Sequence, residues 1–587
     1  MHEKVVVQLR KTWTWFAGGL ILAVYLAVIM ALPRGAFYSP DSGGKYLQML
    51  GCHLDGGVQC VPVYPAAVAD PDFLFYGHQA EEPTVTVMYP YLSETGEART
   101  GWTPWFPLLT WPFYRVWGVT GLHLIPWMAG LLLIVLAGVV AERLCAGTGP
   151  FAAVVVGIGT PVLFYSMCFW EHTLAVALAL AALLPWVSPA QNTSTPAICH
   201  RHWFVSAALM IAACALRREL IFFLGAGMLT LGWLHPQRRR YLPVMLAILL
   251  ALGVGGSLLL FVYPASLWWI FPTPLSDMRW LRSLLSADLW QQFPSNIIRV
   301  LVLSDFDTQF SKPVLSVAFL GLTLCVLSPL CPIRWRRTMV LLGAAIFSVP
   351  AAVMAFTPVR YRYLNSLLLP APFALLTLLP SGVAASIARR RLECSIILFL
   401  AAFYMILPAA APVHGGIEWG SRYALIVIVL LNVLGVVKIT ETIIAKQGLT
   451  DGARWMVTLL ASWLFFLGMV SATRGINELH QTRRNLLTLQ SELEQGGDAV
   501  VTDSFWLGLS LAPFYARHEV YVLSTAHPLQ EWLMRIGAKR YRFTYVGKIA
   551  PGEFPDQEAP RWFSQEVPAE IGMPVTRFQR RPHKGNR

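Results

Sequence analysis

Charged side chains are scarce in this sequence. Asp, Glu, Lys and Arg make up only 13% of the 587 residues, while 56% of the residues are hydrophobic. A typical soluble domain carries about 25% charged residues. The mean hydropathy of +0.55 shows the same bias. A water-soluble globular protein is therefore excluded, and we expect a chain that crosses a membrane several times.

Several motifs of soluble chemistry are also missing. The sequence has no Cys and His residues at zinc-ligand spacing, no Walker loop and no dinucleotide-binding glycine pattern. The net charge of +13 is better explained by basic cytoplasmic loops than by nucleic-acid binding. No metal cofactor is predicted with certainty, and the question of a divalent cation stays open.

The nine cysteines fall into two groups. Most lie within apolar stretches, where they are expected to be small buried hydrophobic residues. Cys52 and Cys60 instead lie close together in the first polar loop. They can form a disulfide if that loop faces an oxidising compartment, and the sequence leaves this open.

Apolar stretches long enough to cross a hydrocarbon layer of ~30 Å recur along the chain. We predict about 13 transmembrane helices on this criterion. The predicted spans are 13–33, 122–142, 150–168, 172–188, 203–217, 219–234, 241–262, 313–331, 338–356, 364–386, 394–412, 423–438 and 454–471. The first span has no clear cleavage site of small residues, so we expect it to remain as a membrane helix.

The basic residues of the short connections predict the orientation, because Lys and Arg favour the cytoplasmic side. With a cytoplasmic N-terminus, the clusters 238–240, 334–337 and 389–391 all lie in the cytoplasm. Residues 203–234 would run about 48 Å as one helix, which is too long for a single crossing. We therefore predict two helices there, with a charged turn at residues 217–219.

The composition changes after residue 471. A charged helical pattern at 476–494 is followed by strand-like segments that alternate with helical patterns, which is typical of an α/β unit with a parallel sheet. The strand candidates are 498–503, 519–524 and 541–546. The last thirty residues are rich in proline and basic residues, and we expect them to be irregular.

Two domains follow from this pattern. The first, 1–471, is a transmembrane domain with a long first extracytoplasmic loop at 34–121. The second, 472–587, is a small extracytoplasmic α/β domain. The predicted fold class is thus an all-α polytopic membrane protein with an α/β domain at its C-terminal end.

Polar residues on the predicted outer side are the candidates for chemistry. The stretch Phe37–Gln48 follows the first span directly and carries Asp41 and Lys45 around a Ser-Gly-Gly sequence. A carboxylate can accept the proton of an attacking hydroxyl. Arginines can hold a phosphate through bidentate hydrogen bonds. The other outer-side candidates are Glu171, His172, Arg217, Arg218, Arg360, Tyr361, Arg362 and Arg422.

This layout resembles the integral-membrane glycosyltransferases of the GT-C fold, of the dolichyl-phosphate-mannose mannosyltransferase and aminoarabinose transferase type. The segments that carry the resemblance are Tyr38-Ser-Pro-Asp-Ser42, Gly101-Trp-Thr-Pro-Trp-Phe-Pro-Leu-Leu109, Pro112-Phe-Tyr114, Phe169-Trp-Glu-His-Thr173 and the proline-containing stretch 360–372. Many members have a paired Asp-Glu in the first outer loop, where this chain has Asp41-Ser42. This departure leaves open whether Asp41 acts alone and whether a metal is needed.

The resemblance implies transfer of a hexosyl or pentosyl group from a polyprenyl-phosphate donor to an acceptor hydroxyl of a glycan, lipid or protein. Asp41 would be the general base, with Glu171 and His172 as further catalytic candidates. Lys45, the arginines and Tyr361 would bind the donor. The expected location is the cell membrane, with the chemistry on the extracytoplasmic face.

Each candidate also has a simpler structural interpretation. Asp41 can cap a helix that begins near Gly44, or pair with Lys45 four residues later. Glu171 and His172 can cap the helix that follows them. The remaining alternatives are pairing of Arg217 or Arg218 with Glu219, anchoring of a helix end by Arg360 and Arg362, and pairing of Glu418 with Arg422.

The main alternative function is a polytopic transporter or flippase of a lipid-linked or small polar substrate. Few charges lie within the predicted spans, and no repeated halves are visible, which disfavours a transporter. A non-catalytic assembly factor whose C-terminal region binds a partner is a second alternative.

Overall fold

The structure is a computed structural model of the chain. The described residues are 2–53, 59–60, 63–64, 66, 69–71, 74–75, 91–92, 98–99, 103–187, 200–217, 219–234, 291, 301, 312–357, 366–380, 385–410, 420–444, 450–496, 499–515, 518–523, 529–536, 542–547, 562–567 and 575–580.

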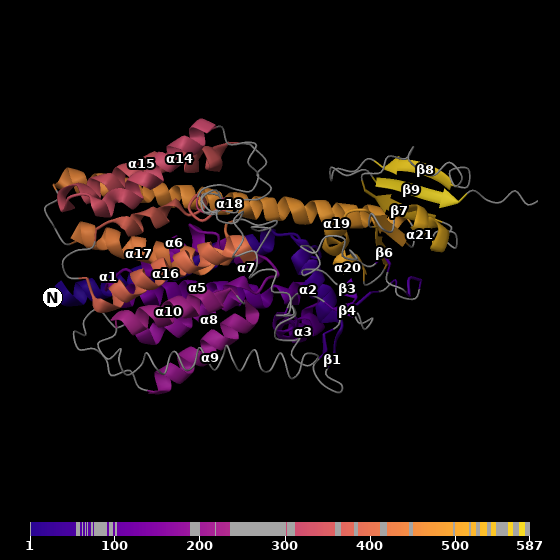
Figure 1. Ribbon diagram of the computed structural model, residues 1–587, viewed down its shortest axis with the longest axis horizontal. Helices are drawn as coiled ribbons and strands as arrows, with labels where there is room; N and C mark the ends of the chain where they lie inside the picture. Colours follow the sequence, from indigo (N-terminus) through magenta and orange to yellow (C-terminus); the bar gives the residue numbers. More distant parts are fainter. Residues whose placement is uncertain are drawn as a thin grey trace, which may run out of the picture.

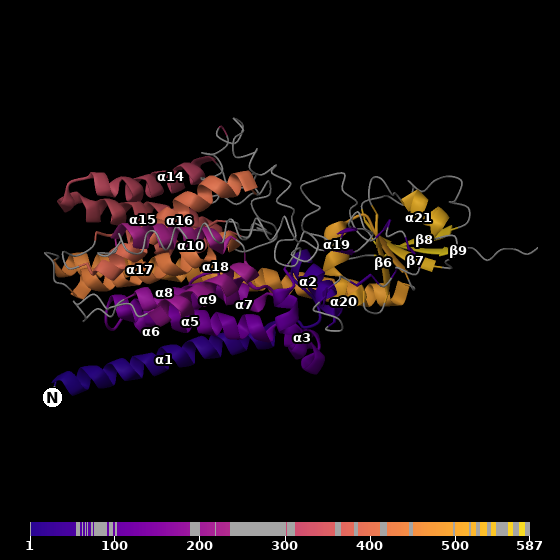
Figure 2. The ribbon, with the colours of Figure 1, turned by 60° about the horizontal axis from the view of Figure 1, so that its bottom comes forward.

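A helical bundle forms one end of the molecule, and a mixed α/β unit forms the other (Figure 1). The bundle contains α1 (His2–Ala31), α5 (Leu124–Leu144), α6 (Gly149–Ile158), α7 (Val162–Met167), α8 (His172–Leu183), η2 (Leu184–Trp186), α9 (His200–Leu216), α10 (Leu220–Leu234), α14 (Lys312–Leu327), η3 (Ser328–Leu330), α15 (Ile333–Phe356), η4 (Pro372–Leu378), α16 (Ile387–Ala410), η5 (Arg422–Ala424), α17 (Leu425–Ile444) and α18 (Asp451–Gly496). Its long helices run side by side along the long axis (Figure 2).

Apolar helices of the bundle are suited to a membrane. Six helices in the described part are long and apolar enough to cross one: Thr12–Ala31, Val119–Leu144, Pro313–Leu330, Trp335–Phe356, Arg422–Ile443 and Asp451–Glu494. This confirms a polytopic, mainly helical membrane protein. The count of about 13 crossings stays a prediction, and the predicted span 241–262 lies outside the described residues.

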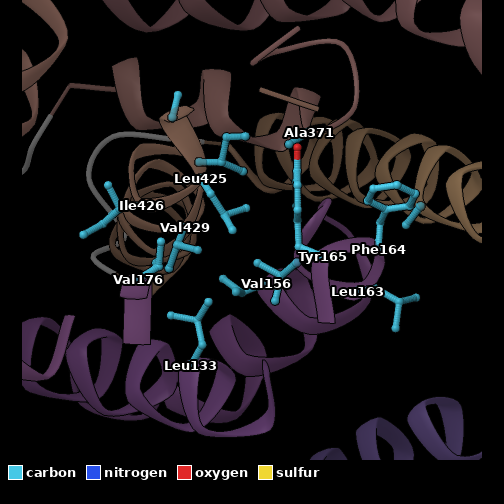
Figure 3. Close-up of a cluster of buried hydrophobic side chains, with 14 of the residues drawn as sticks. Leu133, Val156, Leu163, Phe164, Tyr165, Val176, Ala371, Leu425, Ile426 and Val429 are labelled. Carbon is cyan, nitrogen blue, oxygen red and sulfur yellow. The ribbon is translucent and has the colours of Figure 1, made fainter. Parts of the chain in front are cut away.

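The bundle core is built from the central helices. Leu133 of α5, Val156 of α6, Tyr165 of α7, Val176 of α8 and Val429 of α17 converge in it (Figure 3). All five side chains are buried. Because these helices share one core, the short segments that join them at its ends are held in fixed positions.

Two sequence predictions about the helices have opposite outcomes. The stretch 203–234 is confirmed as two helices, since α9 ends at Leu216 and α10 begins at Leu220. A helical span at 364–386 is wrong, because the described residues 366–380 form only the 3-10 helix η4. The prolines at 370, 372 and 380 explain this, since each lacks the N–H that an α-helix needs.

Helix α18 connects the bundle to the α/β unit (Figure 1). The sequence predicted a crossing at 454–471 and a charged helical pattern at 476–494, and the structure joins them in one helix of 46 residues. Such a helix is about 69 Å long, which is more than twice the hydrocarbon thickness. Its second half therefore extends beyond the apolar part of the bundle and leads into the sheet.

The α/β unit contains a five-stranded sheet in the order β6-β5-β7-β9-β8. Its elements are β5 (Ala499–Thr502), α19 (Phe505–Ser510), α20 (Ala512–Tyr515), β6 (Glu519–Val522), α21 (Leu529–Arg535), β7 (Arg542–Val546), β8 (Trp562–Val567) and β9 (Val575–Arg580). The predicted parallel sheet is confirmed, because β6, β5 and β7 are parallel. The predicted irregular end is wrong, since β8 and β9 form an antiparallel pair. Their aromatic and β-branched residues favour strands.

The first loop packs against this sheet. Phe75 and Tyr64 lie in the same apolar cluster as Tyr521 and Trp532, and the carbonyl of Phe75 accepts a hydrogen bond from the N–H of Val522 at 2.8 Å. The side chain of Asp70 holds the loop by accepting bonds from the Tyr64 hydroxyl and from the N–H groups of residues 74 and 75. The sequence did not predict this contact.

The first loop and the segment after it contain further described elements. They are α2 (Pro40–Leu50), β1 (Cys52–His53), β2 (Gln59–Cys60), β3 (Tyr91–Leu92), β4 (Ala98–Arg99), α3 (Trp105–Trp117) and α4 (Val119–Leu122). A disulfide joins Cys52 and Cys60 across the β1–β2 pair. This pairing answers the question that the sequence left open.

Gly43 is the point of closest approach between α2 and α19. A Cβ atom at Gly43 would lie 1.8 Å from the carbonyl oxygen of Leu509, so only glycine fits. We expect Gly43→Ala to destabilise the protein by about 1–3 kcal/mol through overpacking, although alanine is the better helix former. Thermal unfolding in detergent measures this.

Gly225→Ala in α10 is the matched control, because a Cβ atom at Gly225 would have no neighbouring atom within 4 Å. That variant should be neutral or slightly stabilising. Equal stability of the two variants would contradict the close packing of α2 on α19.

Candidate active site

The short helix α2 presents Asp41 and Lys45 at the end of the bundle. Ser39 is its N-cap, with a hydroxyl that accepts a bond from the N–H of Ser42 at 3.4 Å, and Pro40 is its first residue. A Ser-Pro pair is a favourable helix start, because proline needs no hydrogen-bond partner there. The helix thus begins before Gly44, and the interpretation of Asp41 as a cap near Gly44 is wrong.

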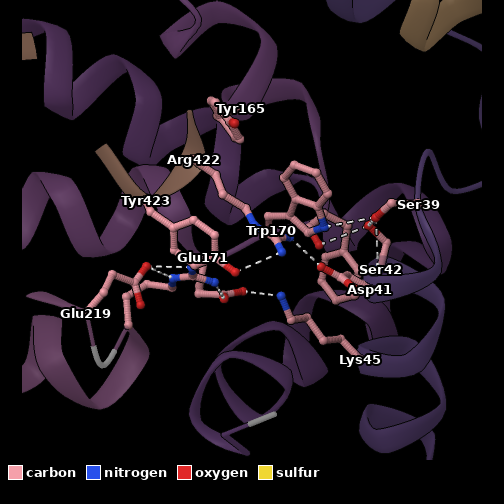
Figure 4. A network of polar contacts seen from close by, with 12 residues as sticks. Ser39, Asp41, Ser42, Lys45, Tyr165, Trp170, Glu171, Glu219, Arg422 and Tyr423 are labelled. Carbon is pink, nitrogen blue, oxygen red and sulfur yellow. Dashed lines mark hydrogen bonds and ion pairs between the residues drawn. The ribbon is translucent and has the colours of Figure 1, made fainter. Parts of the chain in front are cut away.

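Asp41 is paired with a residue far along the chain. Nη1 of Arg422 donates to Oδ2 of Asp41 at 2.7 Å, across 381 sequence positions (Figure 4). Nη2 of Arg422 donates to the hydroxyl of Tyr423 at 3.0 Å. The side chains of Asp41 and Arg422 are 14% and 7% exposed. Asp41 therefore keeps some access to solvent while its charge is balanced.

Glu171 lies at the centre of a second charged group. Its Oε2 accepts from Nζ of Lys45 at 2.6 Å, and its Oε1 accepts from Nη1 of Arg217 at 3.0 Å. The side chains of Lys45 and Glu171 are only 3% and 6% exposed. Arg217 also contacts Glu219 at 2.5 Å, so pairing of Arg217 with Glu219 occurs alongside its contact with Glu171.

The charges around Glu171 determine its protonation. Burial alone would raise its pKa, but the positive charges of Lys45 and Arg217 outweigh that effect and lower the pKa from 4.5 to about 2. Glu171 is therefore ionised at neutral pH, with both oxygens occupied by cations. This arrangement favours a role in holding the cations over a role as a proton acceptor.

Residues 168–171, here called the connector, join α7 to α8 and contact the N-cap and the N-terminal half of α2. The Ser42 hydroxyl donates to the carbonyl of Phe169 at 3.4 Å, and Nε1 of Trp170 donates to the Ser39 hydroxyl at 3.1 Å. Glu171 adds the contact to Lys45 one turn later. The connector and α2 thus form the frame of the site.

His172 is the first residue of α8 and is 2% exposed. Its ring stacks on Tyr165 with 5.3 Å between centroids and lies 5.2 Å from Trp170. Within the described part of the chain, neither ring nitrogen has a hydrogen-bond partner. The imidazole is therefore placed among aromatic rings with two unsatisfied nitrogens next to the charged groups.

Tyr423 lies between the two arginines of the site. The guanidinium carbons of Arg217 and Arg422 are 5.4 Å and 4.9 Å from its ring centroid. Such cation–π contacts keep planar cations at fixed positions. The Tyr165 hydroxyl donates to the carbonyl of Gly420 at 2.6 Å and fixes the backbone just before Arg422.

The structure brings together most of the predicted residues that it describes. Asp41, Lys45, Glu171 and Arg422 lie close together (Figure 4). Arg217 joins them through Glu171 and Tyr423, and the His172 ring lies beside Trp170. Lys45 pairs with Glu171 and not with Asp41, so the simple helix pair is wrong. Five other residues that the sequence analysis names lie outside the described residues: Arg218, Arg360, Tyr361, Arg362 and Glu418.

Some residues of the site were missed by the sequence analysis. Ser39 and Trp170 connect α2 to the connector, and Tyr423 orients two arginines. Ser39-Pro40 carries a recognisable helix-start signal. Trp170 and Tyr423 have no such signal, because their roles depend on contacts between distant segments.

The site can hold an anion and accept a proton. It contains three cations, Lys45, Arg217 and Arg422, and three carboxylates, Asp41, Glu171 and Glu219. Among the described residues, no three His, Cys, Asp or Glu side chains gather as metal ligands. The side chains of arginine and lysine are suited to binding phosphate. The Asp41 side chain is more exposed than the Glu171 side chain.

Removal of the Glu171 charge should destabilise the fold. In Glu171→Gln, Lys45 and Arg217 stay buried without this counter-charge, so we expect the free energy of unfolding to fall by about 3–5 kcal/mol. Unfolding of the purified protein in detergent measures this. Glu531→Gln is the control, since Glu531 pairs with a half-exposed Arg535 at 2.9 Å and should cost less than about 1 kcal/mol. Similar losses of unfolding free energy in the two variants would contradict the role of Glu171 as the counter-charge of Lys45 and Arg217.

The stability should also depend on pH through Glu171. Its pKa is lower in the folded state, about 2, than its ordinary value of 4.5. The stabilisation is therefore complete above pH 4.5 and is lost as the pH falls toward 2. Across this window we expect the native protein to lose up to about 3 kcal/mol more than Glu171→Gln. Parallel pH profiles of the two proteins would show that Glu171 is not responsible.

Comparisons with known proteins give a limited result. No family model and no curated protein matches the chain. Similar solved structures include ArnT from Cupriavidus metallidurans, in the apo state (11% identity, TM-score 0.45) and bound to undecaprenyl phosphate (14% identity, TM-score 0.45). Each alignment covers 95% of this chain and 97% of that chain.

Another similar structure is the archaeal oligosaccharyltransferase AglB from Archaeoglobus fulgidus, in complex with an inhibitory peptide and a dolichol-phosphate. It is 10% identical with a TM-score of 0.43, over 91% of this chain and 69% of that chain.

Proposed function

We propose that this chain is a membrane glycosyltransferase that moves a sugar from a polyprenyl-phosphate donor to an acceptor hydroxyl on the extracytoplasmic face. The observation that carries the proposal is a partly exposed carboxylate, Asp41, together with two buried cations, Lys45 and Arg422, and a partly buried one, Arg217, at the end of an apolar bundle. A lipid phosphate matches this combination. Its hydrocarbon tail would lie along the apolar helices, and its phosphate would meet Lys45, Arg217 and Arg422.

The proposed reaction is a direct displacement. The oxygen of the acceptor hydroxyl attacks the anomeric carbon of the donor sugar, and the bond from that carbon to the phosphate oxygen breaks. The acceptor proton goes to Asp41, and the electron pair of the broken bond leaves with the polyprenyl phosphate. The cations stabilise the charge that develops on the leaving phosphate, which is the main source of such catalysis.

Arg422 connects the proton transfer to the departure of the phosphate. Before reaction its guanidinium is paired with the Asp41 carboxylate. When Asp41 takes the proton, this ion pair is lost and the Arg422 guanidinium can contact the leaving phosphate. The same guanidinium therefore pairs first with Asp41 and then with the leaving phosphate.

The other residues receive secondary roles in this proposal. Glu171 holds Lys45 and Arg217 at fixed positions, and His172 offers its two ring nitrogens to the sugar or the acceptor. Arg218, Arg360, Tyr361 and Arg362 remain predicted donor contacts. The N-terminus lies in the cytoplasm, and the domain at 472–587 lies outside the cell with the site. The proposal covers a hexosyl or pentosyl group and a glycan, lipid or protein acceptor.

Asp41→Asn tests the proposal. The amide keeps the size of the side chain but cannot accept the proton, so transfer should fall about 10²–10⁴-fold. The measurement is release of polyprenyl phosphate from a polyprenyl-phosphate sugar by purified protein. Asp451→Asn is the control, because the Asp451 side chain is 92% exposed, and it should keep full activity.

Two outcomes would contradict the proposal. Full turnover by Asp41→Asn would remove Asp41 as the base. Movement of a lipid-linked sugar across proteoliposomes, without any release of polyprenyl phosphate, would instead support the transporter or flippase.

A further inference from the structure

Arg483 is a buried cation whose position is not explained by a counter-ion. It lies on α18 and is 3% exposed. No ion pair with a carboxylate involves it within the described residues, and its Nε has no hydrogen-bond partner there. Burial of a cation without a paired carboxylate is unfavourable unless hydrogen bonds hold it.

Arg483 contacts the segment that leads into the site. Nη2 of Arg483 donates to the carbonyl of Met167 at 2.6 Å, across 316 sequence positions. Met167 is the last residue of α7, and Cys168 after it is extended, with φ −89° and ψ 147°. The last carbonyls of a helix lack a hydrogen-bond donor, because no further helical turn supplies an N–H group. The guanidinium supplies a hydrogen-bond donor to the Met167 carbonyl, at the residue just before the connector.

The connector transmits this position to the charged groups. After Cys168, its three remaining residues each contact α2 or its N-cap, through the Phe169 carbonyl, the Trp170 indole and the Glu171 carboxylate. These contacts fix the connector relative to α2, which carries Asp41 and Lys45. Glu171 of the connector also contacts Arg217. A shift at the start of the connector would therefore move the cations relative to Asp41.

We propose that Arg483 is a positioning residue, which fixes the connector from α18 and thereby holds the phosphate-binding cations in register with Asp41. Its catalytic effect rests on the proposed function, whereas its effect on the connector does not. Arg483 touches neither donor nor acceptor in this role. The same contact links the site to the helix that enters the C-terminal sheet.

Replacement of Arg483 is the test, with the neighbouring Arg484 as the control. Arg484 is exposed on the same helix, so Arg484→Met removes the same charge without touching the connector. In Arg483→Met, hydrogen exchange of the amides of 168–172 should become faster. The kcat for sugar transfer should fall about 10–100-fold, because small misplacements of catalytic groups have effects of this size. Affinity for free polyprenyl phosphate should fall with it.

Arg483→Lys keeps a charged donor and should recover part of the slow exchange and of kcat. It also keeps the test valid if Arg483→Met does not fold. The proposal is overturned if Arg483→Met matches Arg484→Met in exchange and in kcat, or if it lowers only the unfolding temperature. Faster exchange at 168–172 in a protein that transfers no sugar would support the positioning role and reject the proposed function.

Discussion

The site depends on the burial of charged groups at the end of an apolar bundle. Lys45, Glu171 and Arg217 are largely removed from water, and each would destabilise the fold without the others. Their burial therefore requires α2, the connector and the turn before α10 to keep their mutual positions. This requirement makes the site rigid in the absence of substrate, which is a condition for electrostatic catalysis.

Two contacts outside the charged groups supply that rigidity. Gly43 lets α2 approach the backbone of α19, and Arg483 ties α18 to the start of the connector. Both partner helices flank strand β5, since α18 ends just before it and α19 follows it. The C-terminal sheet is thus connected to α2 through α19 and to the connector through α18. On this view the α/β unit contributes to the geometry of the site even though, among the described residues, no strand of its sheet supplies one of the charged groups.

The sequence predicted the outlines of this arrangement better than its contacts. Apolar runs and basic loops are local features, so the helical membrane class, the pair at 203–234 and the parallel strands followed from them. Proline density at 370–380 was outweighed by hydrophobicity, which produced a wrong helix. Asp41, Lys45, Glu171 and Arg422 were identified by their charge and by their predicted position on the outer side. The contacts of α2 with Arg422 and Trp170 were not predicted, because these residues lie far from α2 in the sequence and only the fold brings them together.

The balance of charge connects this geometry to the proposed reaction. The described part of the site contains three cations and three carboxylates, so it is neutral before a donor enters. A sugar phosphodiester adds one negative charge, and its cleavage to a monoester adds a second. Proton transfer to Asp41 removes one negative charge at the same moment, so the total in the site does not rise during bond cleavage. A buried site tolerates little change in net charge, and this compensation explains why the proton acceptor lies beside a guanidinium that can serve the phosphate next.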